Sequence, residues 1–342
     1  MRKLLNTLYV LSEEAYLSLD GETVEVSIAE KRQNIPLITL ESIVCFSYKG
    51  ASPALMGKCA KLGISITFLT PNGRYLATVN HLERGNVLLR REQYRIADSE
   101  TKSAGIARSF LVGKLYNTKY VLARTLRDHP LQVNKGLIEQ ATCRMADYMK
   151  QLRLADEKSS LMGIEGNAAG EYFSCFNEMV LKDKDFFLFD RRNRRPPTDP
   201  VNSLLSFAYT LLGSDCASAL HSVGLDPFVG FLHVDRSGRE SLALDLMEEL
   251  RPIVADRFVL YLINNRILTK ADFLFMENGA VYLKDEARKV FLNYWQEHKR
   301  EELRHPFLEE KINWGLVPYV QSLLLARHIR GDIDAYPPMF WK

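Results

Sequence analysis

The stretch GFLHVDRSGRESLALDLMEELRP, residues 230–252, contains one histidine, His233, and a helix-like segment that carries Asp245, Glu248 and Glu249. His233 precedes a polar turn, and the following segment 241–251 has the apolar period of an amphipathic helix. On such a helix Asp245 and Glu248 are i,i+3 neighbours, with Cβ atoms about 5–6 Å apart. The two acids can therefore share one cation with His233. Alternatively, they face water on an ordinary surface helix and His233 is a packed or surface residue.

A further acidic residue, Glu165, lies in the stretch GIEGNAAGEYFSCFNEM, residues 163–179. If a helix begins near Glu165, the residues that share its face are apolar: Ala168, Ala169, Tyr172, Phe173 and Phe176. A carboxylate on a buried face must be neutralised, paired or bound to a cation, because unpaired burial is costly. The alternative is an acidic residue in the first turn of a helix, where the helix dipole favours negative charge.

Carboxylates together with one imidazole are typical ligands of a hard or borderline cation, so Mg²⁺ or Mn²⁺ is the expected cofactor. Such an ion polarises a phosphate and stabilises the attacking and leaving oxygens of phosphoryl chemistry. The five cysteines are odd in number, widely spaced and without a CxxC motif. This pattern argues against a disulfide framework and against a cysteine zinc site.

Basic residues concentrate in two stretches of the chain. From Arg84 to Arg124 there are nine Lys or Arg against three Asp or Glu, and the run KDKDFFLFDRRNRRPPTDP spans residues 182–200. These stretches are either solvated charged faces or a surface that binds the phosphates of a nucleic acid. On the second interpretation, the candidate DNA-binding residues are Arg84, Arg91, Lys114, Arg191, Arg194 and Arg195.

The composition of the whole chain is that of a globular protein. Of its 342 residues 46% are hydrophobic and 25% charged, with a net charge of +3, which suggests two domains or one large one. The N-terminus becomes charged too early for a signal peptide. The apolar run LLSFAYTLL is much shorter than the ~20 residues of a membrane span. We therefore expect a soluble, cytoplasmic protein with no membrane partner.

The pattern of apolar residues changes near residue 84. Before it the chain reads as short strands, with a hairpin signal in LDGETV and one helix in SPALMGKCAKLG, capped by Ser52 and ended by Gly63. After it the period is helical, and no convincing strand appears. The sequence predicts an α+β fold, with a small β-rich N-terminal domain (1–84) and a larger all-α C-terminal catalytic domain (85–342).

Four motifs occur in order along the chain: GIEGNAAGEYF, RPPTDPVNSLLSFAYTLL, GLDPFVGFLH and SLALDLMEELRP. In this order they resemble the CRISPR-associated Cas-one family, the integrases of spacer acquisition, and most closely its type I-C members. The two-domain organisation and the tail YPPMFWK fit the same family. The resemblance therefore covers essentially the whole chain.

The resemblance implies a set of site residues. The family holds a divalent metal through a glutamate, a histidine and a later acid, which match Glu165, His233 and Glu248. Asp245 lies beside them and completes the expected catalytic set. Many relatives carry aspartate at the position of Glu248, which is one methylene longer. The division of labour between Asp245 and Glu248 therefore stays open.

The resemblance also implies a reaction and an assembly. The family inserts a short duplex, the prespacer, into the CRISPR repeat array. The 3′-hydroxyl of the prespacer attacks a repeat phosphodiester in a transesterification that needs no ATP. Two homodimers flank a dimer of the small partner Cas-two in a hetero-hexamer, and the N-terminal domain is the expected dimerisation element. The alternatives are a catalytically silent DNA-binding scaffold of the adaptation complex and a general nuclease of branched DNA.

Overall fold

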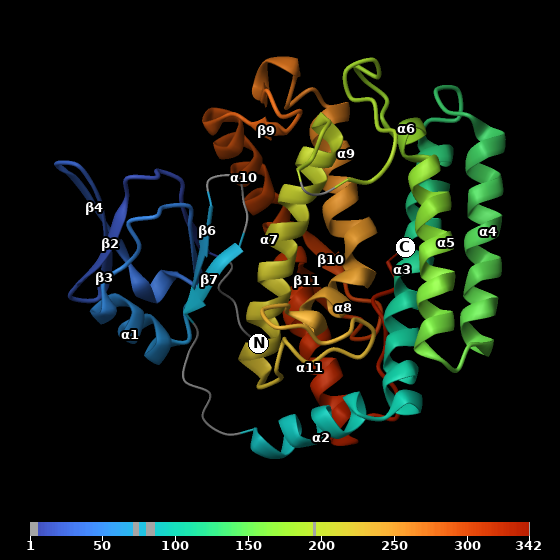
Figure 1. Ribbon diagram of the computed structural model, residues 1–342, viewed down its shortest axis with the longest axis horizontal. Helices are drawn as coiled ribbons and strands as arrows, with labels where there is room; N and C mark the ends of the chain where they lie inside the picture. The colour runs from blue at the N-terminus through green and yellow to red at the C-terminus, as the bar shows by residue number, and fades with distance from the viewer. Residues whose placement is uncertain (1–5, 71–74, 80–85, 194–195, 342) are drawn as a thin grey trace. The chain divides into compact units, whose positions relative to one another are not determined.

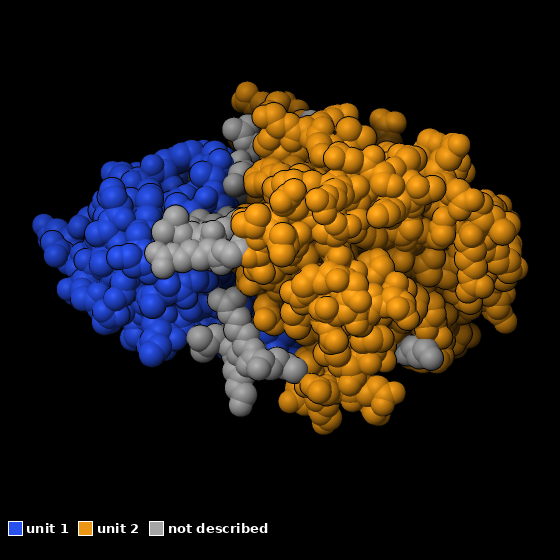
Figure 2. All heavy atoms as spheres, turned by 90° about the horizontal axis from the view of Figure 1, so that it is seen from below, with its two compact units in different colours: residues 1–85, 285–301, 313–316 blue, residues 86–284, 302–312, 317–342 orange. Residues whose placement is uncertain are grey.

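The computed structural model describes residues 6–341 except 71–74, 80–85, 194 and 195. The chain divides into two compact units (Figure 2). Unit 1 contains Met1–Gly85, Asp285–Glu301 and Asn313–Leu316, and unit 2 contains Asn86–Lys284, Glu302–Ile312 and Val317–Lys342. Unit 1 thus includes two late segments that the sequence grouped with the helical region.

Unit 1 contains two small sheets. The strands β2 (Tyr16–Asp20), β3 (Thr23–Ile28) and β4 (Lys31–Pro36) form an antiparallel meander. Asp20 pairs with Thr23 across a tight turn, and Gly21 takes the positive φ of 56° that such a turn requires. The second sheet has the order β1 (Thr7–Val10), β5 (Ser42–Cys45), β6 (Ser65–Leu69) and β7 (Tyr75–Val79). Its first three strands are parallel, and β7 is antiparallel to β6.

One helix, α1 (Pro53–Leu62), joins β5 to β6 and has the predicted ends. The Ser52 side chain accepts a hydrogen bond from the backbone of Leu55, and Gly63 ends the helix in the left-handed conformation. Apolar residues of both sheets and of α1 form one core, in which Leu17, Ile43, Leu55, Cys59 and Ile66 are fully buried. Unit 1 also contains α10 (Asp285–Arg300) and the 3₁₀ turn η4 (Trp314–Leu316).

Unit 2 is mostly helical (Figure 1). Its helices are α2 (Val87–Ala97), α3 (Glu100–Asp128), α4 (Lys135–Leu154), α5 (Lys158–Ser174), α6 (Phe176–Met179), α7 (Pro200–Val223), α8 (Ser241–Leu250), α9 (Arg257–Asn264) and α11 (Val317–Arg330). A π-helical turn, η2 (Arg251–Asp256), joins α8 to α9, and the 3₁₀ turn η3 spans Lys270–Asp272. Two ribbons, β8 (Phe273–Phe275) with β9 (Val281–Leu283) and β10 (Glu302–Arg304) with β11 (Lys311–Asn313), add strands that the sequence did not predict. Each strand has only three residues, too few for an alternating pattern to be recognised.

Helix α3 packs against α4, α5 and α8 and so lies at the centre of unit 2 (Figure 1). Its first turn is capped by Ser99, whose side chain accepts from the backbone of Lys102. Gly113 lies at a close approach in the middle of the helix. A Cβ atom there would stand 2.9 Å from Glu249 Oε2 and 3.0 Å from the Cβ of Pro338. The absence of a side chain lets α8 and the C-terminal tail close on α3.

The sequence analysis argued against a disulfide framework and against a membrane span. The five cysteine side chains carry free thiols, four of them buried and Cys143 exposed. Among the described helices none combines the length and the apolar character needed to cross a membrane.

Candidate active site

Glu165 lies in the middle of α5 and faces a lysine of α3. Because α5 begins at Lys158, Glu165 is two turns from the helix start, so a first-turn dipole interaction does not explain its position. The Lys114 ammonium donates a hydrogen bond to Glu165 Oε1. The same ammonium donates to Glu248 Oε2 of α8 at 2.7 Å. Carboxylates that are 83 residues apart in the sequence thus converge on one cation.

Glu248 is buried and has two cationic partners. Arg251, one turn further on, forms an ion pair with Glu248, with Nη1 3.0 Å from Oε1. Burial alone would raise the pKa of the Glu248 carboxyl, but the charges of Arg251 and Lys114 outweigh it and lower the pKa to about 2. Glu248 is therefore ionised at neutral pH. The interpretation of this helix as a water-facing acidic surface is wrong, because Asp245, Glu248 and Glu249 are all buried.

Asp245 is fully buried and holds the loop that carries His233. Its oxygens accept hydrogen bonds from the backbone N–H groups of Phe231, Leu232 and His233 at 2.6, 2.9 and 3.0 Å. Its Oδ1 is also 2.6 Å from His233 Nδ1. Gly230 permits this packing, since a Cβ there would stand 2.9 Å from Asp245 Oδ2.

The contact with Asp245 sets the orientation of the His233 ring. An ionised carboxylate can only accept, so Nδ1 carries a proton, and in the neutral form of the ring the lone pair lies at Nε2. This is the usual arrangement of a metal-binding histidine, whose second nitrogen donates to a carboxylate. His233 also contributes to the low pKa of the Glu248 carboxyl, which places the ring within electrostatic reach of that residue.

Glu249 points away from this cluster and binds the C-terminal tail. Its carboxylate accepts hydrogen bonds from the Tyr336 hydroxyl, from the backbone N–H of Met339 at 2.8 Å and from the Gln321 amide at 3.0 Å. Asn117 of α3 donates to the backbone oxygens of Glu249 and Met339, both at 2.7 Å. Burial raises the pKa of the Glu249 carboxyl to about 7. Glu249 therefore joins the tail to the helix that carries Glu248.

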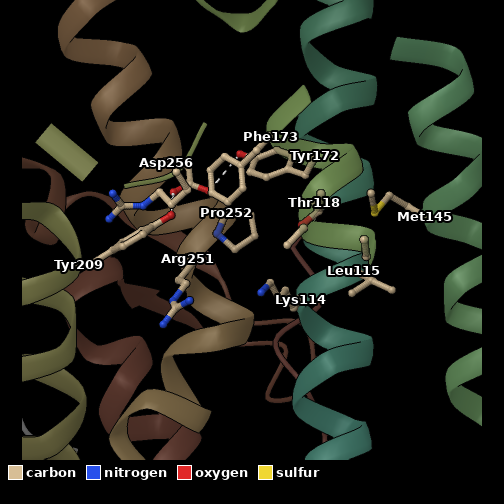
Figure 3. Close-up of a pocket in the computed structure, with 13 residues that line it drawn as sticks. Lys114, Leu115, Thr118, Met145, Tyr172, Phe173, Tyr209, Arg251, Pro252 and Asp256 are labelled. Atoms are coloured by element: carbon tan, nitrogen blue, oxygen red, sulfur yellow. Dashed lines mark hydrogen bonds between the residues drawn. The ribbon is translucent and has the colours of Figure 1, made fainter. Parts of the chain in front are cut away.

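A cavity of about 30 Å³ lies beside the carboxylates (Figure 3). Three cations, Lys114, Arg192 and Arg251, are among its lining residues. The guanidinium groups of Arg192 and Arg251 each lie 5.2 Å from the centre of the Tyr209 ring. In Figure 3 the Lys114 side chain extends from α3 toward the segment that carries Arg251. The cavity is thus positively charged next to the two carboxylates.

Asp256, which the sequence did not single out, also lines this cavity. Its carboxylate accepts from the hydroxyls of Tyr209 at 2.6 Å and Tyr172 at 3.0 Å. Burial raises the pKa of Asp256 to about 6. The acid compensates part of the positive charge of the cavity and fixes the two tyrosine rings.

The predicted basic residues have different environments. Lys114 is enclosed, with a side chain 12% exposed, and it already pairs with two carboxylates. Arg91 on α2 and Arg191 in the loop before α7 are exposed. Three of the candidates lie outside the described residues: Arg84, Arg194 and Arg195.

The sequence reasoning did not single out Arg251, Tyr209 or Asp256. Arg251 could have been found, because it stands three residues after Glu248 and i,i+3 neighbours meet on a helix. Asp256 and Tyr209 had no local signal. They meet only because η2 inserts a π-helical turn after α8, a feature that often marks functional sites.

The residues present suit a hard divalent cation. Among the described residues no three acidic, histidine or cysteine side chains already enclose a position for an ion. Glu165 and Glu248 nevertheless point at one shared cation position, and His233 has an oriented Nε2. Mg²⁺ keeps several waters and needs only one or two protein carboxylates, so this donor set fits it.

The fold and the site together define a class of protein. It has a β-rich part and a mostly helical unit, whose helices bring two carboxylates and several cations together, and a loop histidine is oriented by an acid of the same helix as one of the carboxylates. Comparison with known families identifies the family itself. Residues 8–297 match the model of CRISPR associated protein Cas1, and the chain belongs to this family, the Cas-one family of the motif comparison.

Two curated relatives match over their full lengths. The chain is 48% identical over 343 residues to CRISPR-associated endonuclease Cas1 1 of Chlorobaculum tepidum, with 100% of both chains covered. It is 49% identical over 347 residues to CRISPR-associated endonuclease Cas1 2 of Rhodospirillum rubrum, again with 100% of both covered. Among solved structures, a casposase bound to integration product has the same fold, with a TM-score of 0.84 at 23% identity, covering 98% of this chain and 94% of the other.

Proposed function

We propose that this chain is a metal-dependent DNA integrase and endonuclease of CRISPR adaptation. It inserts prespacer DNA into the repeat array by attack of the prespacer 3′-hydroxyl on a repeat phosphodiester, a transesterification. The observation that supports this most is the convergence of Glu165 and Glu248 on one cation position, near an imidazole that Asp245 orients. Two full-length relatives that are CRISPR-associated endonucleases support the same assignment.

Glu165, His233 and Glu248 would hold Mg²⁺ or Mn²⁺. The bound ion supplies Lewis-acid polarisation of the scissile phosphate and stabilises the charge of the transition state. In this proposal Asp245 is a positioning residue, because its oxygens already accept three backbone N–H groups and the His233 ring. These partners support a division of labour in which Glu248 binds the ion and Asp245 positions His233.

The cations beside the carboxylates would receive the negatively charged DNA. Arg251 and Arg192 line the cavity next to Glu248 and can donate to phosphate oxygens. The exposed Arg91 and Arg191 would contact the backbone further from the reacting phosphate, without reading sequence. Arg84, Arg194 and Arg195 keep the same proposed role.

The proposed assembly follows the family. DNA, both as prespacer duplex and as CRISPR repeat, is the substrate, and the chain acts as a homodimer through its N-terminal domain. Two homodimers would flank a Cas2 (Cas-two) dimer in a hetero-hexamer. A solved structure described as a Cas6-RT-Cas1--Cas2 complex has the same fold and supports the partnership. The resemblance to type I-C members stays a prediction.

An integration assay tests the proposal against its alternatives. Purified chain, Cas2, a prespacer duplex and a repeat-containing target are mixed with Mg²⁺, with Mn²⁺ or with excess chelator. Joined product that forms only with metal and only with a free 3′-hydroxyl is the expected result. DNA binding without any joined or cut product would identify a silent scaffold. Cleavage of branched DNA, with no joining even when Cas2 is present, would identify a general nuclease.

A further inference from the structure

Lys114 is enclosed within the candidate site and already makes two charged contacts. Its ammonium donates to Glu165 Oε1 and, at 2.7 Å, to Glu248 Oε2. Lys114 therefore forms ion pairs with both carboxylates, and its ammonium stands at the position on which they converge.

The charges of this cluster balance without any further ion. Two carboxylates, Glu165 and Glu248, are matched by two cations, Lys114 and Arg251. A divalent cation that binds the same oxygens adds two positive charges to a neutral cluster. Since the site is buried, the repulsion between that ion and the Lys114 ammonium is weakly screened. The ion and the ammonium also compete for the same carboxylate oxygens.

We propose that Lys114 is an internal counter-cation, which competes with the divalent metal for Glu165 and Glu248 and makes metal loading depend on the arrival of a DNA phosphate. This inference rests on the proposed function. Without DNA, the ammonium neutralises both carboxylates and metal binds weakly. When a DNA phosphate reaches the cations beside the cavity, the ammonium shifts its hydrogen bonds to the phosphate oxygens and the carboxylates are released to the ion. Each ligand then tightens the other by the same factor, as linkage requires.

Two observations support a release toward the cavity. Lys114 lines the cavity as well as contacting the carboxylates, so a small movement of a flexible side chain reaches either side. The other cavity cations, Arg192 and Arg251, would hold the same phosphate. The proposal therefore gives Lys114 a metal-gating role in addition to the DNA contact that the sequence predicted for it.

The test measures Mn²⁺ binding to the full-length protein by electron paramagnetic resonance, with and without a prespacer duplex. Lys114→Met removes the competing charge and keeps the aliphatic chain. We expect it to bind Mn²⁺ at least tenfold more tightly than the wild type in the absence of DNA. Duplex should tighten Mn²⁺ binding to the wild type by a larger factor than to Lys114→Met.

Lys102→Met is the matched control. Lys102 is an exposed residue of the same helix, about 18 Å from Lys114 along the axis at 1.5 Å per residue. The control loses the same charge and should bind Mn²⁺ within twofold of the wild type. Circular dichroism verifies folding. Lys114→Gln, whose amide group keeps hydrogen-bond donors without a charge, replaces Lys114→Met if that variant is unfolded.

The outcomes separate this inference from the proposed function. If Mn²⁺ binds the wild type and is lost in Glu248→Gln, while Lys114→Met binds it no more tightly, the counter-cation role is wrong and the metal site stands. If Mn²⁺ binds neither the wild type nor Lys114→Met, with or without duplex, the proposed metal dependence and this inference fail together.

Discussion

Three acidic residues of α8 have three separate sets of partners. Asp245 holds the loop of His233, Glu248 pairs with Lys114 and Arg251, and Glu249 binds the C-terminal tail. A helix turns about 100° per residue, so neighbouring acids point in different directions and can serve different purposes. The chemistry of the site at the residue scale therefore depends on the direction of each acid as much as on its type.

Asp245→Asn tests the positioning role of Asp245. The amide keeps the shape of the side chain but is a poorer acceptor and no longer favours a proton on His233 Nδ1. We expect metal affinity and joining rate to fall by roughly 10–100-fold, as for other residues that support a metal ligand. Joining rates and Mn²⁺ titration measure the effect. Complete loss of Mn²⁺ binding, equal to that of Glu248→Gln, would instead make Asp245 a ligand.

Asp256 should make the stability of the protein depend on pH. Its pKa rises from 3.8 unfolded to about 6 folded because burial disfavours the charged form. Stabilisation is therefore complete below about pH 4 and is lost as the pH rises through about 6, by about 3 kcal/mol at 1.36 kcal/mol per pH unit. Urea unfolding between pH 4 and 7 should show a smaller decline in Asp256→Asn than in the wild type. Parallel curves for the two proteins would contradict this.

At the residue scale the sequence could predict candidates but not their partners. The apolar face of α5 predicted a buried Glu165, and its side chain is 26% exposed and pairs with Lys114; the predicted helix start was two turns too late. Nothing local could distinguish Asp245 from Glu248. Their partners come from residue 114, from residues 231–233 and from the π-helical turn, and these segments meet only in the folded chain.

Two structural features bring these residues together: the π-helical turn η2 and the contact of the C-terminal tail with α3 and α8. The π-helical turn η2 places Arg251 beside Glu248 and Asp256 in the cavity. The tail crosses α3 near Gly113 and is fixed by Glu249, Asn117 and Gln321. Because Glu249 follows Glu248 directly, the tail also restrains the helix that carries the site.

Tyr336→Phe tests how much the contact between the C-terminal tail and Glu249 stabilises the protein. The variant removes the hydroxyl that donates to the buried Glu249 carboxylate and accepts from the Gln321 amide, without changing the aromatic ring. We expect the free energy of unfolding at pH 8 to fall by about 1.5–3 kcal/mol, the usual cost for a bond to a charged group. Chemical denaturation measures it. Tyr319→Phe, a half-buried tyrosine of α11, is the control and should lose less than about 0.5 kcal/mol. An equal loss of unfolding free energy in both variants would rule out a specific stabilising role for the contact between the tail and Glu249.

On the scale of the whole molecule, the chain consists of two units with different architectures. Unit 1 has its own core between two sheets and one helix, and unit 2 contains every described residue of the candidate site. The change near residue 84 was predictable because the apolar period switches from two to 3.6 residues. The membership of α10 and η4 in unit 1 was not predictable, since only long-range packing determines it.

If the chain forms a homodimer, its mass in solution should be twice that of one chain. The chain alone should elute in light-scattering chromatography at about 78 kDa, twice its 39.2 kDa. Cross-linking of mixed light and heavy isotopic copies should give inter-copy cross-links within residues 1–84. A mass near that of one chain at micromolar concentration would contradict the dimer. A dimer with all inter-copy cross-links in unit 2 would contradict the assignment of the N-terminal domain.

Metal-dependent strand transfer by Glu165, His233 and Glu248 is the central claim. Joining of a labelled prespacer to a repeat target should be measured with Cas2 and Mn²⁺ for the wild type, Glu165→Gln, His233→Ala and Glu248→Gln. Lys102→Met serves as the surface control. We expect each site variant to lose joining by at least a hundredfold, while DNA binding persists and the control stays near the wild type. Normal joining by all three site variants would contradict the claim.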